Sequence, residues 1–312
     1  MSDNILDKLL SSGLPLEQEI AEIAYGEGFL LNGEFSYLRK TETGTDSEFS
    51  VDIHAESSVK NPSTSASVTI NALMECKYSS PGVEWIFSSL PDHAPGVISA
   101  ASYFQWLGGH IILRSDDFDR IEPEHYCSRG ISLSSKSSDT KQIRHGLQQL
   151  RHAIPHLLDK ITTIDIEIGE AYAPPIIAPM LITNAPMRVL NPGVTITDIK
   201  SAKTLDSISS IAKMVCHYQP GGPELLDTCI KMEDKINKKY DHSLIEKIMP
   251  LDIFSSIESI TIVSIEYLKT HLSNFNNFFS KSQIMSSLDY AHKFQKPLEN
   301  HKNGKPHHQE NN

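Results

Sequence analysis

The stretch that decides the fold is NALMECKYSS, residues 71–80. After three apolar residues it places Glu75 and Lys77 one residue apart, with Cys76 between them. Residues two apart in a strand point to the same face of a sheet, so Glu75 and Lys77 share one face and Cys76 points to the other. A buried acid and a buried amine are both costly. The pair therefore either lies on a solvated face or serves a chemical purpose.

The chain before this stretch predicts a hairpin that brings a second acid to Glu75. Three runs are strand-like, at 34–40, 48–55 and 68–78. Asp52 is a lone acid between apolar neighbours in the second run, and a polar loop at 60–67 follows that run. If the second and third runs pair through this loop, Asp52 and Glu75 meet at one edge of the sheet.

Helical and strand patterns continue on both sides of the hairpin. A helix is predicted over 12–29, with Pro15 in its first turn and a stop at Gly26 or Gly28. The remaining elements are a helix at 96–107, a strand at 110–114, a helix at 137–160 capped by Ser137 or Asp139 and kinked or divided by Pro155, a strand at 179–190, and helical segments after residue 200, around 259–279. This order predicts an α/β fold, a mixed central β-sheet flanked by helices. We expect it to span residues 1–285, the last third being an α/β extension, before a polar, disordered tail at 286–312.

Composition narrows the class of protein. The 312 residues carry a net charge of −11, which argues against a uniformly basic surface that coats nucleic acid but suits a cluster of metal-binding carboxylates. No apolar run approaches the roughly 18 residues of a membrane span. The N-terminus lacks the basic region of a signal peptide, and the four cysteines show no CxxC spacing. We therefore expect a soluble, cytoplasmic protein with reduced thiols and no membrane partner.

Two carboxylates that meet in a sheet repel each other unless a cation holds them. Mg²⁺ (or Mn²⁺) prefers hard oxygen ligands, and it often takes one or two carboxylates and keeps waters and substrate phosphates. Asp52 and Glu75 are therefore candidate metal ligands, and the backbone carbonyl of Cys76 is a third. The ammonium of Lys77 would orient the attacking water and stabilise developing negative charge.

These residues also carry a resemblance. Asp52, then twenty-two residues, then Glu75-Cys76-Lys77 resembles the D…(D/E)xK signature of the PD-(D/E)xK, restriction-endonuclease-like nuclease superfamily, although Val51 replaces the nominal proline. The resemblance covers about residues 14–115, or up to 190 if the strand at 179–190 is taken as one that follows the core in some members, and it leaves the C-terminal third unexplained. It implies a restriction-endonuclease-like core in which a leading helix adds a catalytic, metal-site glutamate, here Glu17, with Glu19 as the alternative.

The function that the resemblance implies is a Mg²⁺-dependent nuclease that hydrolyses phosphodiester bonds in DNA. The resemblance suggests a role in restriction or phage defence, in which the protein forms a homodimer or binds a partner protein of the defence system. Lys141, Arg144 and Arg151 fall on one face of the helix at 137–160, where they would contact phosphates.

Other interpretations compete with a nuclease site. The first is a catalytically inactive nuclease-like fold that binds nucleic acid or protein within a larger complex. The second is a surface ion pair between Glu75 and Lys77, worth about 0–1 kcal/mol. The third is zinc binding by His125 and Cys127, or by the histidines at 152 and 156, although neither pair forms a four-ligand pattern.

Overall fold

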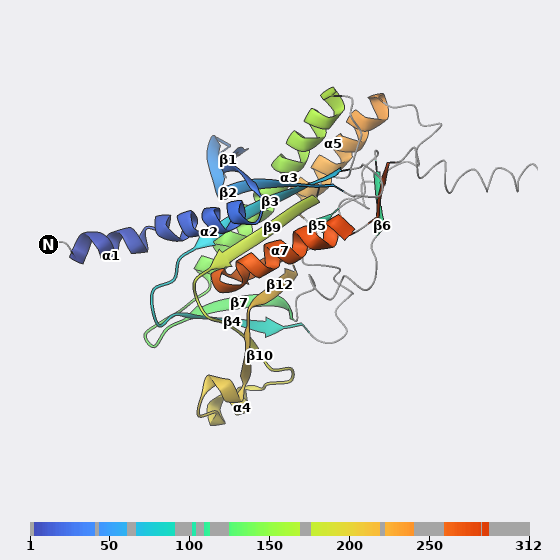
Figure 1. The fold of residues 1–312 in the computed structure, drawn as a ribbon. Coiled ribbons are helices and arrows are strands. Elements are labelled where there is room, and N and C mark those ends of the chain that lie inside the picture. Colours follow the sequence, from blue (N-terminus) through green and yellow to red (C-terminus); the bar gives the residue numbers. More distant parts are fainter. Residues whose placement is uncertain are drawn as a thin grey trace, which may run out of the picture.

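The computed structural model describes residues 3–40, 44–60, 67–90, 102–103, 109–112, 125–168, 176–218, 222–239, 259–281 and 283–286. Within them, helices lie on both faces of one large mixed sheet (Figure 1). The helices are α1 (Asp3–Ser11), α2 (Leu14–Gly26), α3 (Lys141–Ile168), α4 (Ile196–Ser201), a 3₁₀ turn η2 (Leu205–Ser207), α5 (Pro223–Lys239) and α7 (Ile265–Lys281). No helix of these residues is long and apolar enough to cross a membrane.

The large sheet contains twelve strands. They are β1 (Leu30–Lys40), β2 (Asp46–Lys60), β3 (Ser67–Lys77), β4 (Glu84–Ser89), β5 (Ser102–Tyr103), β7 (Tyr126–Leu133), β8 (Ser138–Asp139), β9 (Ile176–Thr183), β10 (Met187–Leu190), β11 (Ser209–Ala212), β12 (Met214–Tyr218) and β13 (Ser259–Ser264). Their order is β1-β2-β3-β9-β13-β12-β7-β4-β10-β11, with β5 against β9 and β8 against β7. A separate ribbon joins β6 (Gly109–Ile112) to β14 (Gln283–Ser286).

The part of the sheet that carries the candidate site is an antiparallel meander, β1-β2-β3, extended by parallel pairing of β3 with β9 and of β9 with β13. Alternation along β3 sends Leu73 into the apolar cluster beneath α3 and α5, and Met74 into the cluster beneath α2 and α7. Each fully buried side chain of this size stabilises the fold by roughly 1.5–3 kcal/mol. The sheet is therefore held from both faces, with α3 directly over Glu75 and Lys77.

Much of the predicted element order is present. The three expected strands are β1, β2 and β3, each at least as long as predicted, and α2 ends at Gly26 as expected. The long helix begins just after Asp139, whose carboxylate accepts a hydrogen bond from the Lys141 N–H at 2.8 Å. The strand expected at 110–114 is described over 109–112, as β6.

Four local predictions differ from the structure, in whole or in part. Pro155 does not divide its helix, because α3 continues to Ile168 through this buried proline. The single strand expected at 179–190 is two strands, β9 and β10, separated at residues 184–186. Residues 259–264 form the strand β13 rather than helix, as their β-branched content favours.

The fourth concerns the helix expected at 96–107, within which residues 102–103 form the strand β5. The rest of that segment lies outside the described residues, as do the interior of the loop at 60–67 and the tail from residue 287 onward.

Candidate active site

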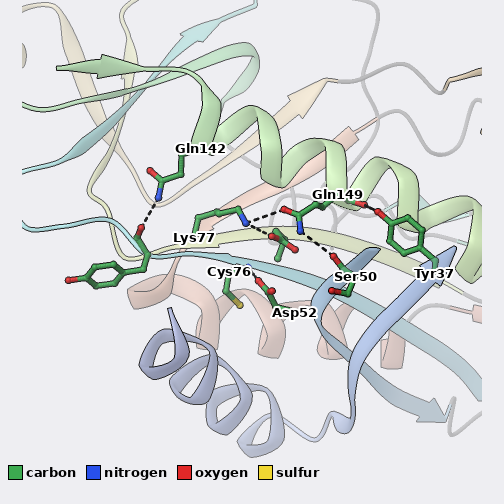
Figure 2. Close-up of polar contacts among 9 residues, drawn as sticks. Tyr37, Ser50, Asp52, Cys76, Lys77, Gln142 and Gln149 are labelled. Carbon is green, nitrogen blue, oxygen red and sulfur yellow. Dashed lines mark hydrogen bonds and ion pairs between the residues drawn. The ribbon is translucent and has the colours of Figure 1, made fainter. Parts of the chain in front are cut away.

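The expected hairpin is present, and it brings Asp52 to Glu75. β2 and β3 pair antiparallel with Ile53 opposite Met74, so the next step of the register sets Asp52 beside Glu75. The Asp52 carboxylate accepts a hydrogen bond from the backbone N–H of Cys76, with 2.7 Å between the nitrogen and Oδ2 (Figure 2). Two residues that are 23 positions apart in sequence are thus neighbours at one point of the sheet.

A β-bulge aims the Asp52 side chain. The β1–β2 register steps from Gly33 opposite His54 to Phe35 opposite Val51, so one residue of β1 faces two of β2, Asp52 and Ile53. A bulge bends its strand and redirects side chains. Val51 accordingly packs under α3 whereas Ile53 packs under α2 and α7. Asp52 lies where this direction changes, which turns its carboxylate toward the backbone of Cys76.

Glu75 is fully buried, with an exposed fraction of 0%. Its Oε1 pairs with the ammonium of Lys77, while its Oε2 has no hydrogen-bond partner within the described part of the chain. Burial and the nearby Asp52 carboxylate raise the pKa of Glu75 to about 7, which outweighs the opposing effects of Lys77 and of the Asp52 backbone N–H; that N–H does not reach hydrogen-bond geometry with Oε2. Burial also raises the pKa of Asp52, although the Cys76 N–H lowers it. Both carboxylates are thus held where their ionised forms are costly.

This arrangement fits a divalent cation. A buried carboxylate oxygen with no partner, beside a second carboxylate, is what bound Mg²⁺ would satisfy. Among the described residues no group of three or more His, Cys, Asp or Glu side chains is arranged as a metal site. The protein would therefore offer Asp52, Glu75 and the Cys76 carbonyl, and the remaining positions would go to water and substrate. Mg²⁺ commonly binds proteins with so few carboxylates.

Glu17 is the helix acid that faces the site. It is half-buried in the first turn of α2, whereas Glu19 is exposed. Burial raises the pKa of Glu17, and so do the charges of Asp52 and Glu34, while Lys77 lowers it. The Glu17 carboxylate therefore lies within electrostatic reach of the hairpin acids and the lysine.

The side chain of Cys76 packs in the cluster beneath α2 and α7, as its position between two charged residues predicted. Burial raises the pKa of its thiol. The thiol is thus kept neutral in the core, and the contribution of Cys76 to the site comes from its backbone.

Sequence reasoning missed the residues of α3 that reach the site. Gln149 Oε1 accepts a hydrogen bond from the Lys77 ammonium at 3.2 Å, and Gln142 Nε2 donates to the Tyr78 carbonyl at 2.6 Å (Figure 2). A Cβ on Gly146 would lie 3.3 Å from Lys77 Cε, so glycine lets the helix approach this closely. The available signal was two glutamines seven residues apart, on one helical face with a glycine between them.

The basic face of α3 is only partly as predicted. Lys141 and Arg144 are exposed, and the charge of Lys77 helps burial to lower the pKa of His145, which places His145 near the site. Arg151 is half-buried instead and packs against Gly222, just before α5.

Both histidines of the 152/156 pair contact Glu224 of α5, at 3.0 Å from His152 and 3.7 Å from His156. They join two helices, and neither they nor His125 with Cys127 belong to a metal-binding group of the described residues. The zinc interpretation therefore gains no support.

Comparisons with protein-family models, with curated protein sequences and with solved structures found no match to this chain. The functional interpretation therefore rests on the residues of the chain and their geometry.

Proposed function

We propose that this protein is a Mg²⁺-dependent nuclease that hydrolyses phosphodiester bonds in DNA. One observation carries the proposal: two buried carboxylates, Asp52 and Glu75, meet beside Lys77, and one Glu75 oxygen lacks a partner. Structural ion pairs are normally satisfied on both sides, because an unpaired buried acceptor costs about 1–3 kcal/mol. A site that keeps this cost is better explained by a ligand than by packing.

The order of elements agrees with the resemblance described above. A helix bearing Glu17 precedes three antiparallel strands, and β3 then pairs in parallel with the strand that follows α3. α2 and α3 cover opposite faces of this sheet. These features support a restriction-endonuclease-like core, and with it membership of the PD-(D/E)xK superfamily, as part of the same proposal.

Each residue has a definable task in hydrolysis. Asp52, Glu75 and the Cys76 carbonyl would hold Mg²⁺. Glu17 would support the site by binding the waters on that ion. Bound Mg²⁺ lowers the pKa of water and neutralises charge that develops on phosphate. The Lys77 side chain is 18% exposed, and its ammonium would position the attacking water and the phosphate oxygens. Lys141 and Arg144 would hold the DNA backbone alongside α3.

The test is nicking of supercoiled plasmid in the presence of Mg²⁺, repeated in EDTA. Lys77→Ala should lower the rate about 100- to 1,000-fold, the usual cost of removing one transition-state donor. Lys8→Ala is the matched control, because Lys8 is an exposed lysine of α1. Nicking that survives both EDTA and Lys77→Ala would overturn the proposal.

Calorimetry separates this function from a catalytically inactive binding module with the same fold. The nuclease requires Mg²⁺ or Mn²⁺ affinity that is lost in Asp52→Asn. If neither ion binds and Asp52→Asn leaves DNA binding unchanged, the module is the correct interpretation.

A further inference from the structure

Three amide side chains surround Lys77 and the two residues after it, and we call Gln142, Gln149 and Asn184 the amide frame. Gln142 and Gln149 come from α3, and Asn184 comes from the turn between β9 and β10. Each makes hydrogen bonds to groups within two residues of Lys77. Side chains from two separate parts of the chain thus hold one short segment, residues 77–79. This arrangement indicates that the position of that segment has to be fixed.

Gln149 connects Lys77 to the strand that carries Asp52. Its Oε1 accepts from the Lys77 ammonium, and its Nε2 donates to the Ser50 carbonyl at 3.2 Å, two residues before Asp52 (Figure 2). The backbone of Gln149 is fixed as well, because the Tyr37 hydroxyl donates to its carbonyl at 3.2 Å. A neutral amide orients the ammonium without adding a further negative charge beside Glu75.

Asn184 and Gln142 hold the backbone just beyond Lys77. The parallel β3–β9 ladder ends at Lys77 opposite Thr183. Asn184 then accepts from the Ser79 N–H at 2.7 Å and donates to the Ser79 carbonyl at 2.9 Å, so its side chain adds one more rung to the ladder. Ser79 is buried, so these two groups would otherwise be desolvated without partners. Gln142 satisfies the remaining carbonyl, that of Tyr78.

We propose that the amide frame positions Lys77 for catalysis: Gln149 fixes its ammonium, and Gln142 and Asn184 fix its backbone. The proposal rests on the proposed nuclease function, in which Lys77 must meet both the attacking water and the phosphate. A displacement of about 1 Å in such a group costs on the order of 100-fold in rate. The three residues act through Lys77 and do not themselves touch the reacting atoms.

The first test compares Gln149→Met with Gln18→Met. Methionine keeps the length of the side chain and removes both hydrogen bonds, and Gln18 is an exposed helical glutamine that donates to Glu22 at 2.9 Å. On plasmid DNA, Gln149→Met should lower kcat about 10- to 100-fold. Its KM and its Mg²⁺ affinity by calorimetry should change less than about twofold, because DNA and metal contact other groups. Gln18→Met should change none of these.

Two further measurements distinguish positioning from general support. In a Lys77→Ala background, Gln149→Met should cause no further loss, since the two residues act as one unit. In protein carrying ¹⁵N in its lysine ammonium groups, the Lys77 signal, assigned from its loss in Lys77→Arg, should broaden or disappear in Gln149→Met and persist in Gln18→Met. Asn184→Leu should weaken the same signal while leaving thermal unfolding cooperative.

These readouts separate this proposal from the nuclease proposal. If the wild-type protein does not cleave DNA, the nuclease function fails, and the Lys77 signal still shows whether Gln149 holds the ammonium. If that signal is unchanged in Gln149→Met, or if kcat and KM are both unchanged, the amide frame does not position Lys77.

Discussion

Replacing Glu75 with glutamine tests whether the candidate site carries a built-in electrostatic cost. Burial and Asp52 raise the pKa of Glu75 from 4.5 to about 7 in the folded protein. The folded state therefore binds this proton more tightly than the unfolded chain does. Stability contributed by this group is greatest below pH 4.5, falls as pH rises toward about 7, and stays low above it. At about 1.4 kcal/mol per pKa unit, the full cost is about 3 kcal/mol.

Glu75→Gln removes the ionisation and leaves a neutral side chain of similar shape beside Lys77. That cost is already net of the Lys77 ion pair, and part of the gain is lost where the amide packs less well than the carboxyl, so we expect the variant to be about 1–3 kcal/mol more stable than the wild type at pH 8 in EDTA. At pH 5 Glu75 is protonated in the folded wild type but largely ionised in the unfolded chain, so the difference should fall to below about 1 kcal/mol. Urea unfolding at the two pH values measures this, with Glu19→Gln as the exposed control. A variant that gains no stability between pH 5 and pH 8, relative to the wild type, would refute the reasoning.

Three further outcomes follow from the structure. Burial lowers the pKa of His271, which is 1% exposed, to about 4. At pH 5 the unfolded chain therefore binds a proton that the folded protein does not, which should lower the free energy of unfolding by about 2 kcal/mol. His271→Leu should abolish this loss, measured as the difference in thermal unfolding between pH 5 and pH 7. A Cβ on Gly146 would lie 2.6 Å from Leu181 Cδ1, so Gly146→Val should push α3 away from the sheet. We expect a loss of about 1–3 kcal/mol in the free energy of unfolding by urea and at least about a tenfold lower nicking rate. An unchanged unfolding midpoint would contradict this. Lys141→Ala and Arg144→Ala should each reduce the salt slope of DNA binding by about 1 in fluorescence anisotropy, and an unchanged slope would remove α3 from the DNA path.

The part of the site on β2 and β3 was predictable because it follows from the alternation of apolar and charged residues along these strands. The pattern around Glu75 assigns the two faces of β3, and the polar loop between two strand-like runs predicts the hairpin that brings Asp52 close. The choice of Glu17 over Glu19 was not predictable from spacing alone. It depends on how α2 packs against the sheet through Leu16 and Ile20.

The rest of the site depends on contacts between distant segments. Gln149 lies 72 residues after Lys77, and its position on one helical face with Gln142 and Gly146 does not by itself show which strand its amide reaches. Local rules also misjudged the turn after β9. There the Ala185 N–H bonds the Thr183 hydroxyl at 3.1 Å, and Asn184 bonds Ser79, so the strand stops before Pro186. Side-chain hydrogen bonds to the backbone compete with the ladder and end it.

The last third of the chain, which the resemblance leaves unexplained, has a structural role at the site. β13 pairs with β9 on the side opposite β3, so β9 is flanked by strands on both edges and all eight of its residues are buried. α7 closes one face, where Asn276 donates to the Glu27 carbonyl at the end of α2 at 2.8 Å. Glu75 and Lys77 therefore lie on a strand whose neighbour is paired on both edges and fully buried. This packing would keep water away from Glu75, and so would preserve the electrostatic cost that the proposed Mg²⁺ would offset.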